Sequence, residues 1–299
     1  MFQQFQQFHP AVMVAIVIAL IAAVVVIYKK ANKKEYFDVD IPMPEKLRTD
    51  LMYGYYSALE RTFDQVKDHV NLFWYTHFSS IEQLIWIMKN TDFKIVVDLS
   101  PYLHAKESGS KGKLYVKDSA ESDLRDFFAR LKFEGVLHHI TFMTTDDEPN
   151  LFTKNAEEHL KAIEVVKRVR AEFAELADSK LLCLYGADGN WMNIEQFDMV
   201  GVDYYDQKSQ SLTIGAHAEL VAALKPGQKT FLVPGPAFGH KPEPWLAYAH
   251  SNPDQVAAII PFIWFDDPNH KDVNYTGLEA ASEELRQAWI NAGKSCVAK

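Results

Sequence analysis

A chain of 299 residues with 48% hydrophobic side chains is long enough to bury one barrel-sized core. Its formal net charge of −9 argues against a nucleic-acid partner, because phosphate binding needs a basic face. The two cysteines, Cys183 and Cys296, lie far apart, and no cysteine–histidine ligand spacing occurs, so neither a disulfide framework, a zinc site nor any other cofactor is predicted.

The first recognisable element is an apolar segment at residues 11–28, which carries no charge and has the length that a membrane-spanning helix needs. No basic residue precedes it and Lys29, Lys30, Lys33 and Lys34 follow it, so an uncleaved anchor is favoured over a signal peptide. The lysines place the rest of the chain in the cytoplasm, whereas an enzyme of the cell surface needs the opposite, and the side stays open. We therefore predict a tail and anchor at residues 1–34 and a tether at 35–49.

From residue 50 onward, apolar runs alternate with segments of helical period. The runs lie at residues 51–56, 71–78, 94–99, 140–145, 181–185, 199–205, 230–233 and 258–265. The helical segments lie at residues 60–69, 80–90, 121–133, 155–177, 216–224, 244–251 and 278–291, with only 193–197 in the fifth unit. Eight such units predict an α/β fold, a (β/α)8 TIM barrel that occupies residues 50–299.

The links that leave the strands are longer than those that enter them, and in a barrel they gather on the functional face. One of them contains KESGSKGK at residues 106–113, whose composition is typical of a mobile flap or of a solvated insertion.

The fourth strand is followed by an unusual concentration of acids. Residues 140–150 read ITFMTTDDEPN, so that Asp146, Asp147 and Glu148 end an apolar run. Crowded carboxylates at a strand end raise one another's pKa, which suits a general acid near neutral pH. The alternative interpretation is an acidic start to the following helix.

Other strand ends add acids and aromatic rings, the combination that a sugar site needs, since rings pack on the pyranose face and carboxylates bind hydroxyls. We predict Glu148, Asp203 and Asp147 as catalytic groups. The predicted substrate-binding residues are Asp98, Tyr204, Trp264, His77 and Tyr75. Histidines are not paired at a strand end, so metal-dependent hydrolysis is disfavoured.

Over residues 51–291 the chain resembles the (β/α)8 glycoside hydrolases, in particular the clan whose acid/base glutamate follows the fourth strand in an Asn-Glu-Pro motif. Asp147-Glu148-Pro149 stands at that place, and DMVGVDYY at residues 198–205 is similar to the sixth strand of many such enzymes. The resemblance implies Glu148 as the acid/base and Trp264 as the platform beneath the sugar.

The chain departs from that clan at the seventh strand, where the clan carries its nucleophile. Here the strand reads TFLVPGPAFG without a carboxylate, and Glu243 beyond it is better explained as a first-turn helix acid. Three solutions stay open: Asp203 or Asp98 activates water, the substrate supplies its own nucleophile beside Asp147 and Tyr204, or the site binds a glycan without cutting it. We therefore expect a membrane-anchored barrel acting on a glycan, or else a non-catalytic glycan-binding or scaffold barrel.

Overall fold

The computed structural model describes residues 48, 50–56, 62–76, 79–108, 112–206, 210–265 and 277–297. The apolar segment predicted as a membrane anchor, at residues 11–28, lies outside this part of the chain. Within the described part, no helix combines the length and the apolar character that crossing a membrane requires.

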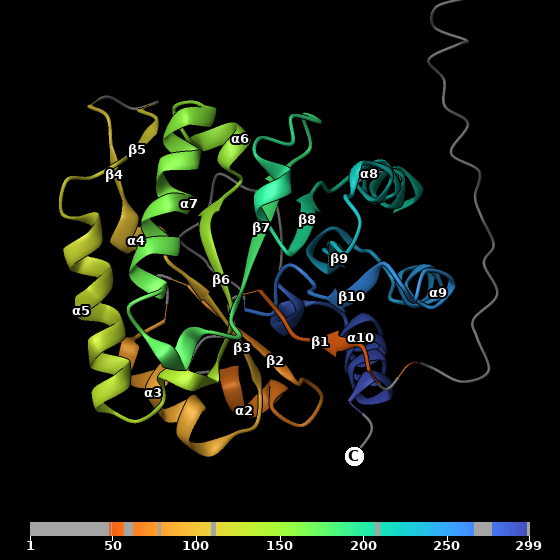
Figure 1. Ribbon diagram of the computed structural model, residues 1–299. Helices are drawn as coiled ribbons and strands as arrows, with labels where there is room; N and C mark the ends of the chain where they lie inside the picture. Colours follow the sequence, from red (N-terminus) through yellow and green to blue (C-terminus); the bar gives the residue numbers. More distant parts are fainter. Residues whose placement is uncertain are drawn as a thin grey trace, which may run out of the picture. The chain divides into compact units, whose positions relative to one another are not determined.

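Eight parallel strands form one sheet, which confirms the predicted α/β barrel (Figure 1). They are β1 (Met52–Tyr53), β2 (Leu72–Tyr75), β3 (Lys94–Asp98), β6 (Ile140–Asp147), β7 (Lys180–Gly186), β8 (Met199–Asp203), β9 (Lys229–Leu232) and β10 (Val256–Ile259). The strand order is β1-β10-β9-β8-β7-β6-β3-β2. Asn71 nearly closes the barrel between β1 and β2, because its N–H donates to the Tyr53 carbonyl (2.9 Å) and its Oδ1 accepts from the Tyr53 N–H (2.7 Å).

Helices follow most strands, near the positions that the apolar periodicity predicts. The longer ones are α3 (Ile81–Asn90), α5 (Ala120–Phe133), α7 (Ala156–Arg170), α8 (Gln210–Ala223), α9 (Glu243–Ser251) and α10 (Glu283–Cys296). Short helices are α2 (Phe63–Val66), α4 (Ser100–Leu103) and α6 (Pro149–Phe152), with 3-10 turns η3 (Leu137–His139), η4 (Ala174–Leu176), η5 (Ile194–Gln196), η6 (Pro236–Phe238) and η7 (Leu278–Ala280). The fifth unit has only η5, as its short periodic segment indicates.

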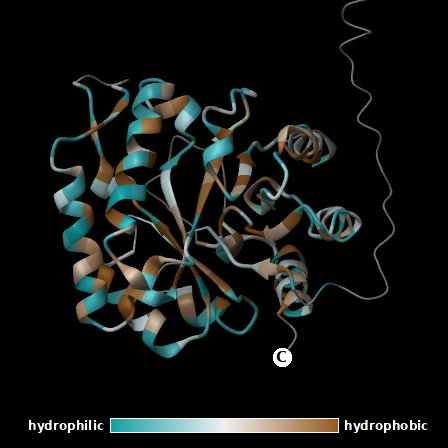
Figure 2. Ribbon diagram, in the orientation of Figure 1, coloured by the Kyte–Doolittle hydropathy of each residue, from teal (hydrophilic) through white to brown (hydrophobic). Residues whose placement is uncertain are grey.

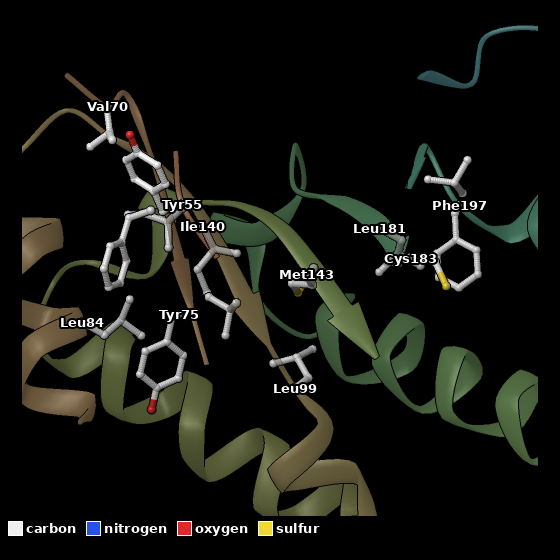
Figure 3. Close-up of a cluster of buried hydrophobic side chains, with 14 of the residues drawn as sticks. Tyr55, Val70, Tyr75, Leu84, Leu99, Ile140, Met143, Leu181, Cys183 and Phe197 are labelled. Carbon is white, nitrogen blue, oxygen red and sulfur yellow. The ribbon is translucent and has the colours of Figure 1, made fainter. Parts of the chain in front are cut away.

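Side chains of the strands alternate between two apolar cores, because neighbouring residues of a strand point to opposite faces. The core inside the barrel includes Leu72, Trp74, Val96, Phe142, Leu182, Leu184, Met199, Phe231, Val233 and Ala258. The larger core lies between the sheet and the helices, and Figure 3 shows part of it, including Tyr55, Tyr75, Leu84 and Met143. Figure 2 shows the strands mainly hydrophobic, while the helices around them also carry hydrophilic residues.

A small antiparallel hairpin interrupts the regular alternation after β3. It consists of β4 (His104–Lys106) and β5 (Leu114–Val116), and β4, β5 and α6 lie at the same end of the barrel (Figure 1). The Leu114 carbonyl accepts from the Lys154 N–H at 2.9 Å, which ties the hairpin to the segment after α6. The sequence predicts a loop here, but both of its arms are strands; residues 109–111 between them lie outside the described part.

Candidate active site

The end of β6 carries the candidate catalytic residues and contains an irregularity. The register against β7 shifts between Thr144 and Asp147, so that Asp147 pairs with Leu184 of the inner core. Asp147 accepts a hydrogen bond from the Tyr56 hydroxyl (2.9 Å), whereas the buried Asp146 pairs with His104 of the hairpin. Adjacent strand residues point to opposite faces, and continued alternation from Phe142 of the inner core would turn Asp146 inward. The shift reverses this, so that Asp147 faces the barrel mouth and Asp146 lies behind the strand.

Glu148 follows in the left-handed region of the backbone map, at φ 48° and ψ 58°. Its N–H donates to the Leu184 carbonyl (3.0 Å), and its own carbonyl accepts from the N–H groups of Leu151 (2.9 Å) and Phe152 (3.0 Å). Few residues other than glycine adopt this conformation, and those that do concentrate at functional sites. The hydrogen bonds on both sides fix the turn that presents the Glu148 side chain.

Gly186, at the end of β7, provides the space for the Glu148 carboxyl. A Cβ on Gly186 would lie 2.9 Å from Glu148 Oε1 and 2.4 Å from Leu151 Cδ1. Asn150 holds this glycine, because its Nδ2 donates to the Gly186 carbonyl (2.9 Å) and its Oδ1 accepts from the Gly186 N–H (2.8 Å). Asn150 also donates to Asp188 in the loop after β7.

Asp203 comes from the end of β8, next to Gly186 in the register. The inner core takes Met199 and Tyr205 from this segment, and the outer core takes Val200, Val202 and Tyr204. Alternation therefore puts Asp203 and Tyr205 on the face toward the barrel interior. Tyr204, predicted to bind substrate, faces the other way, and its hydroxyl donates to Asp206 at 3.4 Å.

The carboxylates influence one another's protonation. Burial, followed by the charges of Asp203, Asp147 and Asp188, raises the pKa of Glu148 to about 9. Burial and the charge of Asp147 raise the pKa of Asp203 to about 7, although the hydroxyl of Tyr205 acts in the opposite direction. At neutral pH, Glu148 therefore holds its proton, while Asp203 is close to its midpoint.

Asp98 belongs to the same group of acids. It is 3% exposed, lies at the end of β3, and accepts from the Ser100 N–H at 2.9 Å. Burial raises its pKa to about 6, against the effect of Ser100. Burial and the charges of Asp147, Asp98 and Asp203 raise the pKa of the Tyr56 phenol, which keeps it a hydrogen-bond donor among the acids.

An aromatic ring lies against Gly235, three residues beyond the end of the seventh strand, β9. A Cβ on Gly235 would lie 2.5 Å from Cδ1 of Tyr205 and 2.8 Å from Cδ2 of Phe238. The Tyr205 ring is stacked against Phe238 (4.9 Å between centroids) and Phe262 (5.3 Å). The space beside Gly235, beyond the end of the seventh strand, is therefore taken by the ring of Tyr205.

Trp264 does not occupy the predicted platform position. It is 1% exposed in the outer core, 4.9 Å from Tyr55 between ring centroids, and its Nε1 donates to Gln65 at 2.9 Å. Its ring therefore has no exposed face for a sugar. The ring that follows β10 near the acids is Phe262, 5.7 Å from Tyr56 between centroids.

Tyr75, also predicted to bind substrate, is not part of the acidic group. Tyr75 is buried in the outer core, where its ring stacks on Phe127 with a centroid distance of 6.4 Å. His77 lies outside the described residues. In the part of the chain that the structure covers, no three His, Cys, Asp or Glu side chains are grouped to hold a metal ion.

The structure thus brings Glu148, Asp203, Asp147 and Asp98 to one end of the barrel. Asn150, Gly186, Tyr56 and Phe262 join them, although sequence reasoning assigns these four no role at the site. Only Asn150 gave a local signal, as the residue that directly follows the Asp-Glu-Pro motif. Together they form an arrangement with a protonated acid and partly ionised carboxylates, beside an aromatic ring.

Solved structures of glycoside hydrolases share this barrel fold. Bacteroides uniformis β-glucuronidase 2, covalently bound to cyclophellitol-6-carboxylate aziridine, is 14% identical with a TM-score of 0.56, over 84% of this chain and 35% of its own. A GH2 β-galacturonidase from Eisenbergiella tayi bound to galacturonate is 10% identical with a TM-score of 0.53, over 85% of this chain and 52% of its own. Another Bacteroides uniformis β-glucuronidase is 12% identical with a TM-score of 0.53, over 82% of this chain and 35% of its own.

At these identities the likeness shows the fold, and the chain spans between about a third and half of each of these proteins. No protein-family model matches the sequence, and no curated protein matches it either.

Proposed function

We propose that the barrel hydrolyses glycosidic bonds of a glycan, with Glu148 as the general acid. The observation that carries this proposal is the Glu148 carboxyl, held by a left-handed turn at the end of the fourth strand, with a pKa raised to about 9. A carboxylic acid that keeps its proton at neutral pH can protonate a leaving glycosidic oxygen.

Asp203 supplies the second group. In its ionised form it takes a proton from water as the water oxygen attacks the anomeric carbon, while the bond to the leaving oxygen breaks and Glu148 protonates that oxygen. Such a single displacement inverts the configuration at the anomeric carbon. In this proposal Asp147, Asp98 and the Tyr56 hydroxyl bind sugar hydroxyls, and the Phe262 ring packs on the sugar face. Its support is the hydrogen bond from Tyr56 to Asp147 and the approach of the Phe262 ring to Tyr56.

Two observations favour this route over the other solutions. The segment TFLVPGPAFG carries no carboxylate, and Tyr205 covers Gly235 just beyond the seventh strand, which disfavours a double displacement with a nucleophile from that strand. Tyr204 packs against the outer core, which disfavours a substrate-assisted reaction that needs Tyr204 to steady an acetamido group.

The alternative is a barrel that binds a glycan without cutting it. The absence of a carboxylate from TFLVPGPAFG favours this alternative, because the clan that the chain resembles uses a carboxylate at the end of its seventh strand as the nucleophile. Both functions use the same acids and the same rings, so only a chemical measurement separates them.

The test is a hydrolysis screen of neutral and acidic polysaccharides with a protein comprising residues 35–299. We expect new reducing ends with inverted configuration, and a loss of several orders of magnitude in kcat for Glu148→Gln and for Asp203→Asn with nearly unchanged binding. Glu243→Gln, which changes a first-turn acid of α9, is the matched control and keeps full activity. Binding without any release of reducing ends, equal in Glu148→Gln, would establish the non-catalytic barrel.

We also propose that residues 11–28 anchor the protein in a membrane. The support is the uncharged run of apolar side chains followed by four lysines. The protein is then expected in the membrane fraction after alkaline extraction, and protease accessibility in intact cells and in lysates reports the side on which the barrel lies.

A further inference from the structure

A cavity lies on the outside of the barrel, beside α2 and α3. It has a volume of about 530 Å³ and is lined by Phe63, Asp64, Ser80, Glu82, Gln83 and Trp86. None of these residues belongs to the acidic group around Glu148, so the cavity is separate from the proposed active site.

An exposed indole ring forms one wall of this cavity. Trp86 on α3 is 51% exposed, which is a large apolar area to leave in water. The ring is held by Phe63 of α2, which meets it edge-to-face at 5.5 Å between centroids and 88° between planes. A fixed aromatic face that stays accessible suits stacking against the flat apolar side of a ligand.

A buried amide lines the same cavity. Gln83 is only 5% exposed, yet its Nε2 has no hydrogen-bond partner among the described residues. A buried donor without a partner is costly, and a ligand oxygen in the cavity would satisfy it. Ser80 contributes a hydroxyl at the same wall, and its Oγ accepts from the Gln83 N–H at 3.1 Å. A hydroxyl that accepts one hydrogen bond can donate another.

Carboxylates supply the acceptors. Asp64 and Glu82 line the cavity, and Asp64 also accepts a hydrogen bond from Lys67 at 2.7 Å. Donors and acceptors around an aromatic face match the hydroxyls and the apolar face of a pyranose. Two carboxylates disfavour an acidic sugar, because like charges repel.

We propose that this cavity is a second glycan-binding site, which takes a neutral sugar unit on the Trp86 ring. This second site rests on the proposed function in one respect, namely that the same polymer binds both at the Trp86 cavity and at the acidic group around Glu148. Ser80 and Gln83 belong to the start of α3, which follows the carboxyl end of β2, the side of the barrel that carries Glu148. A polymer bound at both sites gains affinity through effective concentration, whereas a short oligosaccharide does not.

The experiment is affinity electrophoresis of the Glu148→Gln protein through gels that contain β-glucan, glucomannan, xyloglucan or polygalacturonate. We expect at least one neutral polymer to retard the protein, and Trp86→Ala and Gln83→Leu to reduce the retardation about tenfold or more. Phe133→Ala is the matched control, since Phe133 is 84% exposed on α5, and its removal should leave the retardation unchanged. Circular dichroism checks that each variant is folded.

Equal retardation of Trp86→Ala and the unsubstituted protein would overturn the proposal, and so would the absence of retardation in every gel. The result also separates this site from the catalytic proposal. Trp86-dependent retardation without any hydrolysis by the wild-type protein sustains the second site and removes the glycosidase. Hydrolysis by the wild-type protein, together with retardation that Trp86→Ala leaves unchanged, supports the glycosidase and overturns the second site.

Discussion

The protonation of Glu148 is the property on which the proposed chemistry depends. Burial and three neighbouring carboxylates favour its neutral form, which is the form that a general acid needs. Asp203 must be ionised to accept a proton, and its pKa is about 7. We therefore expect hydrolysis to fall below pH about 7, as Asp203 gains a proton, and above pH about 9, as Glu148 loses one. A rate that keeps rising below pH 5 would contradict these roles.

A substitution of Asp188 should shift the alkaline limb of the pH dependence of hydrolysis. Its charge helps to raise the pKa of Glu148, and its side chain is exposed, so Asp188→Asn should leave the fold intact. The alkaline limb should move to lower pH, since ionised Glu148 then meets less repulsion. Asp178→Asn removes an exposed charge just before the start of β7, far from Glu148, and should leave the profile unchanged.

Gly186 should tolerate no side chain. Alanine there would place its Cβ 2.4 Å from Leu151 and 2.9 Å from the Glu148 carboxyl, so that the general acid must move. A displacement of about 1 Å can cost about 100-fold in rate, which is the loss in kcat that we expect.

Gly189→Ala is the control for that substitution. Gly189 has a φ of +75° but no atom within 4 Å of an added Cβ, so alanine there costs only about 1–2 kcal/mol of backbone strain. Thermal stability should fall while kcat stays unchanged. Equal losses of activity at both glycines would show that stability, not the position of Glu148, limits the rate.

Residues at strand ends are predictable from sequence only where the alternation of the strand continues. Asp203 lies within the regular part of β8. The sequence therefore leaves two possibilities, in which either Asp203 and Tyr205 or Tyr204 faces the barrel interior. Trp264 lies five residues beyond Ile259, where β10 ends and Pro261 intervenes, so no alternation connects it to the sheet. The contact of Asn150 in α6 with Gly186 at the end of β7 joins residues 36 positions apart, and no local sequence pattern predicts it.

At the scale of elements, the hairpin of β4 and β5 is the part of the fold that the sequence did not predict. Its strands have three residues each, too few for a periodic signal, and its arms depend on contacts with the segment after α6. The eight barrel strands were predictable because buried parallel strands form apolar runs. The last one was placed too late, since the apolar run continues past Pro261 while the strand ends at Ile259.

The pair of His104 and Asp146 fastens this hairpin to the back of β6. Burial works against the charged imidazole, but the hydrogen bond and charge of Asp146 outweigh it and raise the pKa of His104. The stability that this pair adds is therefore fully present below the unfolded pKa of about 6.5 and is lost as the pH rises through the folded pKa.

His104→Gln should destabilise the protein by about 3 kcal/mol at pH 5.5, because it leaves the buried Asp146 without its charged partner. The difference from wild type should shrink toward pH 9, as measured by urea unfolding. His138→Gln, at an exposed histidine of η3, should change stability little at either pH. A constant difference across this range would mean that the pKa of His104 is the same in the folded and the unfolded chain, so that Asp146 does not stabilise the charged imidazole.

At the scale of the whole molecule, the barrel should fold without the segments that precede it. Arg48 marks its beginning, since its guanidinium donates to the Val256 carbonyl (2.8 Å) and pairs with Asp50. A protein comprising residues 46–299 should therefore be soluble and unfold cooperatively in circular dichroism. Arg48→Ala in that protein should cost about 1–3 kcal/mol, from the loss of hydrogen bonds to a charged group. An aggregated product would show that the anchor and tether belong to the folding unit.

The fold follows from apolar periodicity that any barrel of this kind shares, whereas the site depends on a few side chains that meet across different strands. That is why the barrel was predictable and the aromatic filling at Gly235 was not. TFLVPGPAFG shows that a carboxylate is missing, but it does not show that Tyr205, 30 residues earlier, has taken the space.

This occupied space also restricts the order in which a nucleophile can be introduced. Gly235→Glu made first would push a new side chain into the Tyr205 ring, which Phe238 and Phe262 hold in place. Tyr205 would have to be exchanged for a smaller residue beforehand, and that step by itself opens a void and removes the hydroxyl beside Asp203. Each substitution made alone is therefore expected to lower stability or activity. A retaining enzyme with a nucleophile at Gly235, whether evolved or engineered, would need the changes at Gly235 and Tyr205 to be made together.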